Sequence, residues 1–457
     1  MKIYIETMGC QMNRLDSELV DGDLRRHGHE IVAGRTNADV VIYNTCSVRQ
    51  QAENKVCSRL GADGQRKSDG KRLIVAVIGC MAQKEGQAMR TKFPQVDIVC
   101  APSRIGELSD MIASAAAGEK VVALDPLRTE NLSRYEGDKL VNQIELNRPV
   151  QSSAQAFVRV AMGCDFFCSY CIVPFVRGPQ RSRRPEDIIT ETRRLLDGGV
   201  SEITLLGQTV NGYSWSDGGA SVRFSDLLCT LSGLGMRRLR FVTSHPLDFG
   251  DDILEAMRDL PNVCPYIHCP AQSGSDAVLK RMNRKYTRAQ YDELVARARD
   301  IVPDVVIAGD FIVGFPGETE KDHEASGELI RKSGYKNSFV FKYSPRPGTL
   351  AQKRMPDDVP MSVKRRRNNE LLAVQEQVGL AHHRQRIGSR MEVLVEGPSP
   401  RSKKEDARAR TPGNVQLVGR TRGDHIVVFE GSPSLAGQYA QIAIEDATSL
   451  TLFGRLA

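Results

Sequence analysis

Three cysteines stand close together near the middle of the chain, Cys164, Cys168 and Cys171, with the spacing CxxxCxxC. Thiolates are soft ligands that suit iron–sulfur clusters and zinc. A loop with three cysteines can bind three irons of a 4Fe-4S cube and leave the fourth iron open to a small molecule. Structural zinc usually takes four closed ligands in two pairs, and no second such pair follows here. The spacing favours an open cluster over zinc.

A second group of cysteines is spread through the first third of the chain. Cys10, Cys46 and Cys80 each stand in a small turn after a short run rich in β-branched residues. In open parallel sheets, ligands bind beyond the carboxyl ends of the strands. We therefore expect these three thiols to converge, which is good geometry for a second cluster with an open iron.

The other cysteines are expected to pack in the interior. Cys57 falls within a predicted helix, and small apolar packing is the simplest role for Cys229, Cys264 and Cys269. Cys100 also follows a short predicted strand, so spacing alone does not exclude it from the second group.

The elements that carry the second group alternate between strand and helix. Strands are predicted at 3–6, 40–43 and 73–78, and helices at 15–27, 49–60 and 83–91. Such alternation indicates a parallel sheet covered by helices, and we assign residues 1–128 to this α/β domain. Residues 129–153 are polar, with few apolar positions at a regular period, and are predicted to form a linker.

The central region, residues 154–385, alternates in the same way and ends in a charged helix over 359–386. Its strands are predicted at 156–161, 201–206, 238–243, 263–268, 304–312 and 337–342. Six strand–helix units are too few for a complete eight-unit barrel and indicate a partial barrel. The CxxxCxxC loop follows the first strand, on the face where such barrels carry chemistry.

The last region, residues 388–455, changes to short strands separated by glycines. The strands are predicted at 391–395, 416–420, 426–429 and 439–447. This pattern is typical of a small β-barrel, a fold that can bind nucleic acid through backbone charge and stacking. The alternative is a barrel that merely packs on the rest of the chain.

Composition sets the remaining limits. The 457 residues carry a net charge of +7, with cations gathered at 177–184, 364–367 and 401–410. This excess is compatible with nucleic acid, although each run alone also fits a solvated surface. No apolar run approaches the roughly 18 residues of a membrane span, and the N-terminus reads as a strand instead of a signal peptide. Eleven scattered cysteines argue against a disulfide framework, so a reducing cytoplasm is predicted.

Polar residues also stand where the central strands end. Gln208, Ser244, Gln272 and Ser273 can offer hydrogen bonds to ribose, adenine or carboxylate groups, and a capped turn explains each of them equally well. His245 precedes a proline and is expected to be a structural hydrogen-bonding group.

The CxxxCxxC loop with Tyr170 resembles the signature of the radical S-adenosylmethionine (SAM) enzymes. With the strand-end segments and the N-terminal cysteine turns, nearly the whole chain resembles the methylthiotransferases, and the MiaB type most closely. The segments that carry the likeness to this type are Gln11-Met12-Asn13, Asn44-Thr45-Cys46-Ser47-Val48-Arg49, Gly207-Gln208 and Val210-Asn211. The C-terminal barrel resembles the TRAM domain. One departure is Gln180, where this type usually carries a glutamate, which puts an acid role at that position in doubt.

The resemblance implies two 4Fe-4S clusters. One, on Cys164, Cys168 and Cys171, would reduce SAM to a 5′-deoxyadenosyl radical. The other, on Cys10, Cys46 and Cys80, would hold the incoming sulfur, which a second SAM methylates. The implied SAM contacts are Tyr170, Gln208, Ser244, Gln272 and Ser273.

The implied substrate is the N6-(dimethylallyl)adenosine beside the anticodon of tRNA, methylthiolated at C2. A flavodoxin or ferredoxin would supply electrons to a monomer. Sister enzymes act on threonylcarbamoyl-adenosine in tRNA or on an aspartate of a ribosomal protein, and both remain alternatives. A metal-stabilised RNA-binding protein is the alternative from another class.

Overall fold

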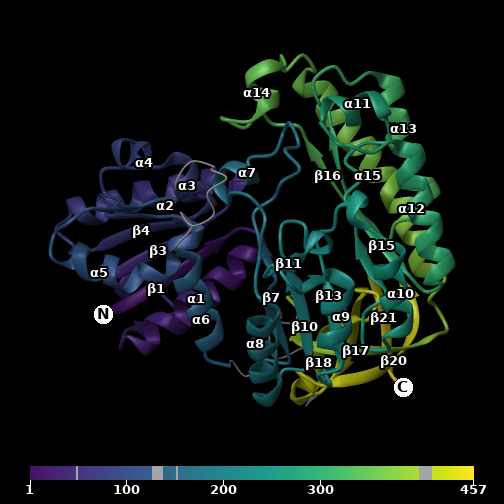
Figure 1. Ribbon diagram of the computed structural model, residues 1–457, viewed down its shortest axis with the longest axis horizontal. Coiled ribbons are helices and arrows are strands. Elements are labelled where there is room, and N and C mark those ends of the chain that lie inside the picture. Colours follow the sequence, from purple (N-terminus) through teal and green to yellow (C-terminus); the bar gives the residue numbers. More distant parts are fainter. Residues whose placement is uncertain (48–49, 126–136, 151–152, 401–413) are drawn as a thin grey trace.

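The computed structural model describes residues 1–47, 50–125, 137–150, 153–400 and 414–457. The chain forms an N-terminal α/β region, a central partial barrel and a closed C-terminal β-barrel (Figure 1). In the described part of the chain, no helix is long and apolar enough to cross a membrane.

The N-terminal region is a six-stranded parallel sheet with the strand order β2-β1-β3-β4-β5-β6. The central strands β3 and β4 are buried along their whole length, which is why they read as continuous apolar runs. The strands are β1 (Lys2–Met8), β2 (Glu30–Ile31), β3 (Val40–Thr45), β4 (Ile74–Gly79), β5 (Ile98–Cys100) and β6 (Val121–Ala123).

Helices pack on both faces of this sheet and confirm the predicted alternation. They are α1 (Gln11–Arg26), α2 (Gln50–Ser68), α3 (Cys80–Glu85), α4 (Gln87–Lys92) and α5 (Leu108–Ala116). The helix predicted at 83–91 is two short helices, because Gly86 adopts a positive φ of 53° between them. The predicted start of the second helix, Arg49, lies outside the described residues.

The polar segment predicted as a linker contains a helix, α6 (Gly137–Asn147). Val141 and Ile144 are buried against the N-terminal core, and Glu145 pairs with Arg159 of the barrel at 2.9 Å. The prediction was wrong here because two apolar residues three positions apart, Val141 and Ile144, are sufficient to bury one face of a short helix. Residues 129–136 and 151–152 lie outside the described part.

The central region is the predicted partial barrel, made of two three-stranded parallel sheets, β13-β10-β7 and β14-β15-β16. A bridge between Leu239 and Val263 joins them, so β7 and β16 are the two outer strands. The barrel strands are β7 (Gln155–Arg159), β10 (Glu202–Leu206), β13 (Arg238–Phe241), β14 (Tyr266–His268), β15 (Val306–Val313) and β16 (Asn337–Lys342).

Helices cover the outside of the partial barrel (Figure 1). They are α8 (Pro185–Asp197), α9 (Phe224–Ser232), α10 (Asp251–Asp259), α11 (Asp276–Arg281), α12 (Arg288–Ile301) and α13 (Glu320–Ser333). Two small antiparallel pairs were not predicted from the sequence, β8 (Ala161–Met162) with β9 (Arg181–Ser182) and β11 (Ser214–Ser216) with β12 (Ser221–Arg223).

After the short helix α14 (Leu350–Arg354), the predicted charged helix, α15 (Met361–Arg384), leads to a closed barrel with the strand order β17-β18-β19-β21-β20. Its strands are β17 (Arg390–Pro398), β18 (Val415–Thr421), β19 (Ile426–Gly431), β20 (Tyr439–Ala447) and β21 (Thr451–Leu456). Four were predicted. The fifth, β21, contains Gly454, where a Cβ would lie 2.1 Å from the Ala443 carbonyl oxygen, so a residue that usually weakens a strand signal is required there.

The closed barrel is fixed to the amino ends of the partial-barrel strands. Arg238 of β13 is buried and donates to the carbonyls of Glu392 and Arg420, both at 2.9 Å. Arg240, two residues on, donates to the carbonyl of Arg422 at 3.0 Å, and Lys336 pairs with Asp424 at 2.8 Å. Because these buried cations find their partners across the interface, the two barrels form one packed body.

Two candidate cysteine sites at the strand ends

Cys10, Cys46 and Cys80 follow three neighbouring strands, β1, β3 and β4. The sequence predicts that these turns converge, and the register places Thr45 beside both Met8 and Gly79, the residues that end the two flanking strands. Cys46 donates a hydrogen bond to the Cys10 sulfur, and the positive charge of Arg177 lies close to the same thiol. Together they lower the pKa of Cys10 to about 6.

Two buried asparagines tie the first two cysteine turns together. Asn13 accepts from the Cys10 backbone N–H at 3.2 Å and donates to the Asn44 side chain at 2.8 Å, and Asn44 donates to the Asn13 carbonyl at 2.8 Å. Neither side chain is exposed. Buried amides are costly unless all their groups are paired, so this reciprocal pair fixes the spacing of the two turns.

The third turn depends on Gly79, just before Cys80. Gly79 has a φ of +92°, and a Cβ there would lie 2.7 Å from both the Asn44 Oδ1 and the Thr45 carbonyl oxygen. A side chain at this position would push Cys80 away from its neighbours, so the glycine holds three strand ends in close contact.

Cys164, Cys168 and Cys171 lie in one loop between β8 and the short helix α7 (Val173–Val176). Gly163, at a φ of +86°, presses the loop onto the following segment, since a Cβ there would be 1.9 Å from the Pro179 carbonyl oxygen. Burial raises the pKa of Cys164, and burial with the neighbouring Cys168 charge raises that of Cys171 to about 12. Thiolates in this loop therefore need a cationic centre to stabilise them.

A buried arginine lies beside each cysteine group. Arg177, six residues after Cys171, donates its Nε to the Cys80 sulfur at 3.3 Å and its Nη2 to Asp16 at 2.9 Å. Its Nη1 is buried and has no hydrogen-bond partner among the described residues. Arg284 donates its Nη1 to the Cys168 sulfur at 3.4 Å. Sequence reasoning missed both, because no local pattern marks an arginine that reaches across domains.

The unused Arg177 donor and the soft donor set both fit an iron–sulfur cluster, whose sulfides accept hydrogen bonds. In the described part of the chain, no three histidine, cysteine or acidic side chains are grouped to hold a single metal ion. A cluster places each thiolate on a different iron, so its ligands do not have to share one ion.

The predicted SAM contacts all lie at the carboxyl ends of barrel strands, on the side of the cysteine loop. Gln208 accepts from the Gly163 backbone N–H, and Ser273 accepts from that of Ser275, so both hold loops in place. Tyr170 packs edge-on against Phe315. Ser244 is buried with no hydrogen-bond partner for its hydroxyl among the described residues, which leaves that group for a ligand.

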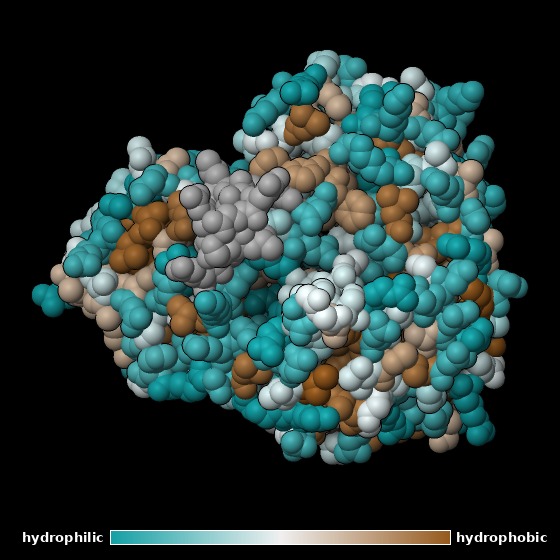
Figure 2. All heavy atoms as spheres, in the orientation of Figure 1, coloured by the Kyte–Doolittle hydropathy of each residue, from teal (hydrophilic) through white to brown (hydrophobic). Residues whose placement is uncertain are grey.

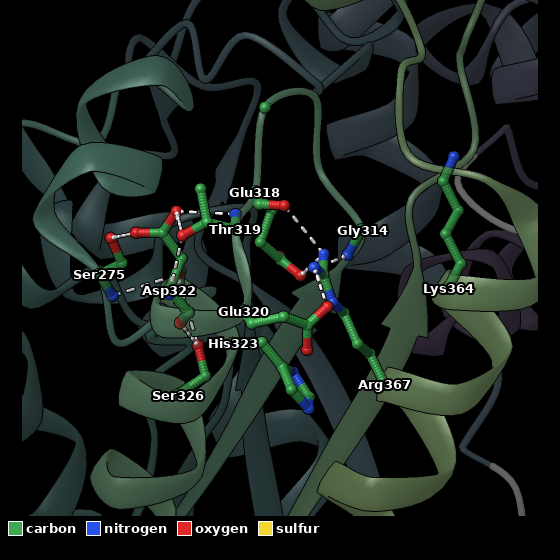
Figure 3. Close-up of polar contacts among 12 residues, drawn as sticks. Ser275, Gly314, Glu318, Thr319, Glu320, Asp322, His323, Ser326, Lys364 and Arg367 are labelled. Carbon is green, nitrogen blue, oxygen red and sulfur yellow. Dashed lines mark hydrogen bonds and ion pairs between the residues drawn. The ribbon is translucent and has the colours of Figure 1, made fainter.

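Gln272 of this set has a left-handed φ of 68° beside β15. The loop that follows β15 is held from outside by α15 (Figure 3). Arg367 donates to Glu318 at 2.9 Å and to Glu320 at 2.7 Å, while Glu318 accepts from the Gly314 N–H at 3.0 Å. The loop that contains Ser273 is tied to α13, because Ser326 and Asp322 of that helix make hydrogen bonds with it. The strand-end loops that face a ligand are therefore fixed by hydrogen bonds behind them.

The cation runs are mostly structural. In the first, Arg177 pairs with Asp16 and Arg183 pairs with Glu191 at 2.7 Å. In the second, Lys364 is buried beside Asp357 and Arg367 beside Glu318, whereas the two arginines between them are exposed. The sequence alone allows each run to be a solvated surface. In the structure, both of these runs contain buried arginines or lysines that form ion pairs. The third run, 401–410, lies outside the described residues.

Two further expectations have clear outcomes. Cys57, Cys100, Cys264 and Cys269 are buried or partly buried in core packing, but Cys229 is exposed on α9, so that prediction was wrong. His245 is a structural group, as expected: its Nδ1 accepts from the Leu247 N–H at 3.3 Å, and burial with the nearby charge of Arg284 lowers its pKa to about 2.

Gln180, the departure from the usual glutamate, donates its amide to the Gly212 carbonyl at 2.6 Å. An ionised carboxylate cannot donate, so this contact requires the neutral amide. At position 180, this chain therefore has a structural hydrogen bond to the Gly212 carbonyl that an ionised glutamate would not make.

Three family models match the chain in order. The uncharacterized protein family UPF0004 matches residues 2–101, the radical SAM superfamily matches 158–330, and the TRAM domain matches 384–457. The chain is 45% identical to a tRNA-2-methylthio-N(6)-dimethylallyladenosine synthase from Rhodopirellula baltica, over 99% of this chain and 95% of the relative. A protein of the same name from Phocaeicola vulgatus is 40% identical, with the same coverage of both chains.

Solved structures show the same fold at low identity. The radical S-adenosylmethionine methyltransferase TsrM from Kitasatospora setae has a TM-score of 0.55 at 11% identity, over 87% of this chain and 79% of its own. The cobalamin-dependent S-adenosylmethionine radical enzyme OxsB has a TM-score of 0.50 at 11% identity, over 82% and 56%.

A partial barrel with a three-cysteine loop, matched by the radical SAM superfamily over 158–330, defines a radical SAM enzyme, a class whose members use SAM and a 4Fe-4S cluster. Within that class, the chain belongs to the tRNA-2-methylthio-N6-dimethylallyladenosine synthases, the methylthiotransferase family whose members align with it almost end to end.

Proposed function

We propose that the protein transfers a methylthio group to C2 of N6-(dimethylallyl)adenosine beside the anticodon of tRNA. The observation that carries this proposal is the position of Arg177. It comes from the segment just after the CxxxCxxC loop and contacts Cys80 and Asp16 of the N-terminal region. The two cysteine groups are therefore close neighbours, as a reaction that activates a carbon and delivers sulfur to it requires.

We infer that Cys164, Cys168 and Cys171 hold one 4Fe-4S cluster and that Cys10, Cys46 and Cys80 hold a second. With SAM bound, the first cluster supplies a primary carbon radical, which the unactivated C2–H bond of adenine needs. The protein stabilises the thiolates of each group with one buried guanidinium, and a hydrogen bond of this kind is among the features that set a cluster's potential.

The proposed SAM contacts have two different roles. Ser244 offers an unused hydroxyl at the end of β13, and we assign it to direct contact with SAM. Gln208 and Ser273 fix the backbone of the surrounding loops, and Tyr170 and Gln272 complete the set. Phe166 stacks on His245 with ring centroids 3.5 Å apart, and this contact ties the cysteine loop to the segment that follows β13.

The TRAM barrel is proposed to bind tRNA, and a flavodoxin or ferredoxin to donate electrons to a monomer in the reducing cytoplasm. The family match to TRAM and the printed name of the relatives support the RNA partner. The proposed reductant follows from the low potential that the cleavage of SAM requires.

The first experiment is anaerobic iron and sulfide analysis of the reconstituted protein and of a Cys164/Cys168/Cys171 triple-alanine variant. We expect about eight irons to fall to about four. A fall from about four to none would remove the second cluster and the sulfur-delivery role with it. Zinc without iron would favour the metal-stabilised RNA-binding alternative. Cys229→Ala, an exposed thiol on α9, is the matched control and should keep all its iron.

The substrate is tested with the loaded enzyme, SAM and a reductant. Anticodon stem-loops that carry dimethylallyl-adenosine or threonylcarbamoyl-adenosine are compared with an aspartate-containing ribosomal-protein peptide, and methylthio products are measured by mass spectrometry. Product on the dimethylallyl RNA is expected. Product only on either of the other two would replace the proposed substrate.

A further inference from the structure

The inner face of β16, an outer strand of the partial barrel, carries two aromatic side chains that the proposed chemistry does not use. Phe339 is 52% exposed and Phe341 is 41% exposed. Their rings stack nearly parallel, with centroids 6.3 Å apart and an interplanar angle of 20°. Burying a phenylalanine stabilises a fold, so a chain that leaves two stacked rings exposed forgoes that stabilisation.

The strand that carries these rings lies at an open edge. Among the described residues, β16 pairs only with β15, and β7 at the other end of the barrel pairs only with β10. The partial barrel is therefore not closed by backbone hydrogen bonds between its first and last strands. Figure 2 shows the molecule divided into two lobes, with an indentation between the N-terminal region and the barrel.

Phe339 faces a cavity of about 730 Å³ to which all three regions contribute. Gln11 and Arg14 of α1 line it from the N-terminal region, Thr243 and His268 from the barrel, and Leu450 from the TRAM barrel. This volume is in the range of ligand pockets, about 300–1,000 Å³. Gln11 directly follows Cys10, so the first turn of the helix that begins at the N-terminal cysteine site forms part of the cavity wall.

A cation accompanies the aromatic pair. The guanidinium of Arg14 lines the same cavity as Phe339, and Arg14 is exposed. Glu18, one helical turn further on, also lines the cavity and lies within the electrostatic reach of Arg14. Exposed aromatic rings beside a cation are an arrangement that binds single-stranded nucleic acid, where bases stack and phosphates are neutralised.

We propose that Phe339 and Phe341 form a stacking platform for the unpaired bases that flank the target adenosine in an RNA loop, with Arg14 at a phosphate. The loop enters through the open edge between β7 and β16. This inference rests on the proposed function and adds the surface that holds the substrate. Stacking the neighbouring bases offsets the cost of taking the target base out of its own stack, so that it can enter the cavity toward Gln11.

A peptide is the other occupant that an open strand edge can take, by adding a strand to β16. Such a peptide would use the backbone of the edge and would not need rings on the face that looks into the cavity. The stacked rings and the guanidinium of Arg14 favour RNA.

The test uses the loaded full-length protein and a fluorescent anticodon stem-loop, compared with a fully paired hairpin of equal length. Phe339→Ala and Phe341→Ala should each weaken binding of the stem-loop about 5- to 150-fold, the range of a base–aromatic stack, and should change binding of the paired hairpin little. Leu372→Ala, which truncates an exposed apolar residue on α15, is the matched control and should bind like wild type. Phe341→Trp should restore binding lost in Phe341→Ala.

A second readout reports stacking directly. A 2-aminopurine placed beside the target adenosine should be quenched on binding to wild type and should stay bright on the double alanine variant. Wild-type modification of RNA with unchanged binding and quenching in both variants would overturn this inference. Binding of the ribosomal-protein peptide and not of the stem-loop would also overturn it. Stem-loop binding that depends on both rings, without methylthiolation of any RNA, would support this surface and contradict the proposed function instead.

Discussion

The two cysteine sites of this chain are built in opposite ways. The N-terminal site takes one thiol from each of three strand ends, and the Asn13–Asn44 amide pair and Gly79 hold those ends together. The barrel site takes all three thiols from one loop, shaped by Gly163. The first therefore depends on the register of a whole sheet, whereas the second depends on the backbone of a few residues.

The two buried arginines extend the contrast. Arg177 contacts Cys80 but also pairs with the carboxylate of Asp16, which offsets its charge. Arg284 contacts Cys168, and its other partners are the neutral Tyr286 hydroxyl and the Pro270 carbonyl. In the described part of the chain, no carboxylate is among the hydrogen-bond partners of Arg284, so its charge is offset less than that of Arg177 and favours the reduced, more negative state of a bound cluster.

The largest predicted effect separates the roles of the two sites. Cys168→Ala should abolish the cleavage of SAM, because the radical site loses a ligand. Cys46→Ala should keep some uncoupled SAM cleavage and stop methylthiolation. Chromatography of 5′-deoxyadenosine and mass spectrometry of the RNA measure the two outcomes, and full methylthiolation by either variant would contradict the assignment.

The next effect concerns reduction potential. Arg284→Met should lower the potential of the barrel cluster by about 60–130 mV, which corresponds to a charged hydrogen bond of about 1.5–3 kcal/mol in a one-electron couple. Arg177→Met should shift the N-terminal cluster less, because Asp16 already offsets the arginine. Redox titration followed by electron paramagnetic resonance checks both, with Arg366→Met, an exposed surface arginine, as control. Equal shifts would show that the charge of Asp16 has no part in the difference.

Thiol reactivity distinguishes the sites in metal-free protein. Cys10 is exposed, and its pKa is lowered to about 6, so it is a thiolate at pH 7. Burial raises the pKa of Cys80, and that of Cys171 to about 12, so both stay protonated there. Iodoacetamide at pH 7 should therefore alkylate Cys10 at least tenfold faster than either, and its rate should fall as the pH drops through about 6. Peptide mass spectrometry with Cys10→Ala as reference measures this order.

The smallest effect is on stability. Asn44→Ala removes one of the two acceptors of the buried Asn13 amide and leaves only the Thr45 carbonyl, which should cost about 1–3 kcal/mol of unfolding free energy. Asn37→Ala, at an exposed position of the same region, should change stability little. Chemical denaturation followed by circular dichroism gives both values. A stable Asn44→Ala variant with full iron would show that the sheet alone sets the spacing of the turns.

Much of the frame could be predicted from the sequence, because strand–turn–helix alternation and cysteine spacing are local signals. Cys10, Cys46 and Cys80 could be placed together since parallel strand ends meet at one edge. The roles of Asn13 and Asn44 could not be predicted, because a buried amide pair depends on the register of two strands. The two arginines that reach the thiols act across domains, beyond any local pattern.

Two errors had signals that local reasoning could have used. On α9, the residues Leu227, Leu228 and Leu231 face the core, and the helical period places Cys229 on the opposite side. In the segment predicted as a linker, Leu140, Val141 and Ile144 stand at helical spacing. In both cases the helical period is a better guide to the structure than the polar or small-residue composition.

The fixed contacts of Arg238 and Arg240 with the TRAM barrel have a geometric consequence. They hold that barrel at the amino ends of the strands, while the cysteine loops lie at the carboxyl ends. A strand of six residues, the length of β16, rises about 20 Å. An RNA that binds the TRAM barrel and reacts at the cysteine loops must span this height. The length of the partial-barrel strands therefore sets the distance between the binding surface and the site of reaction.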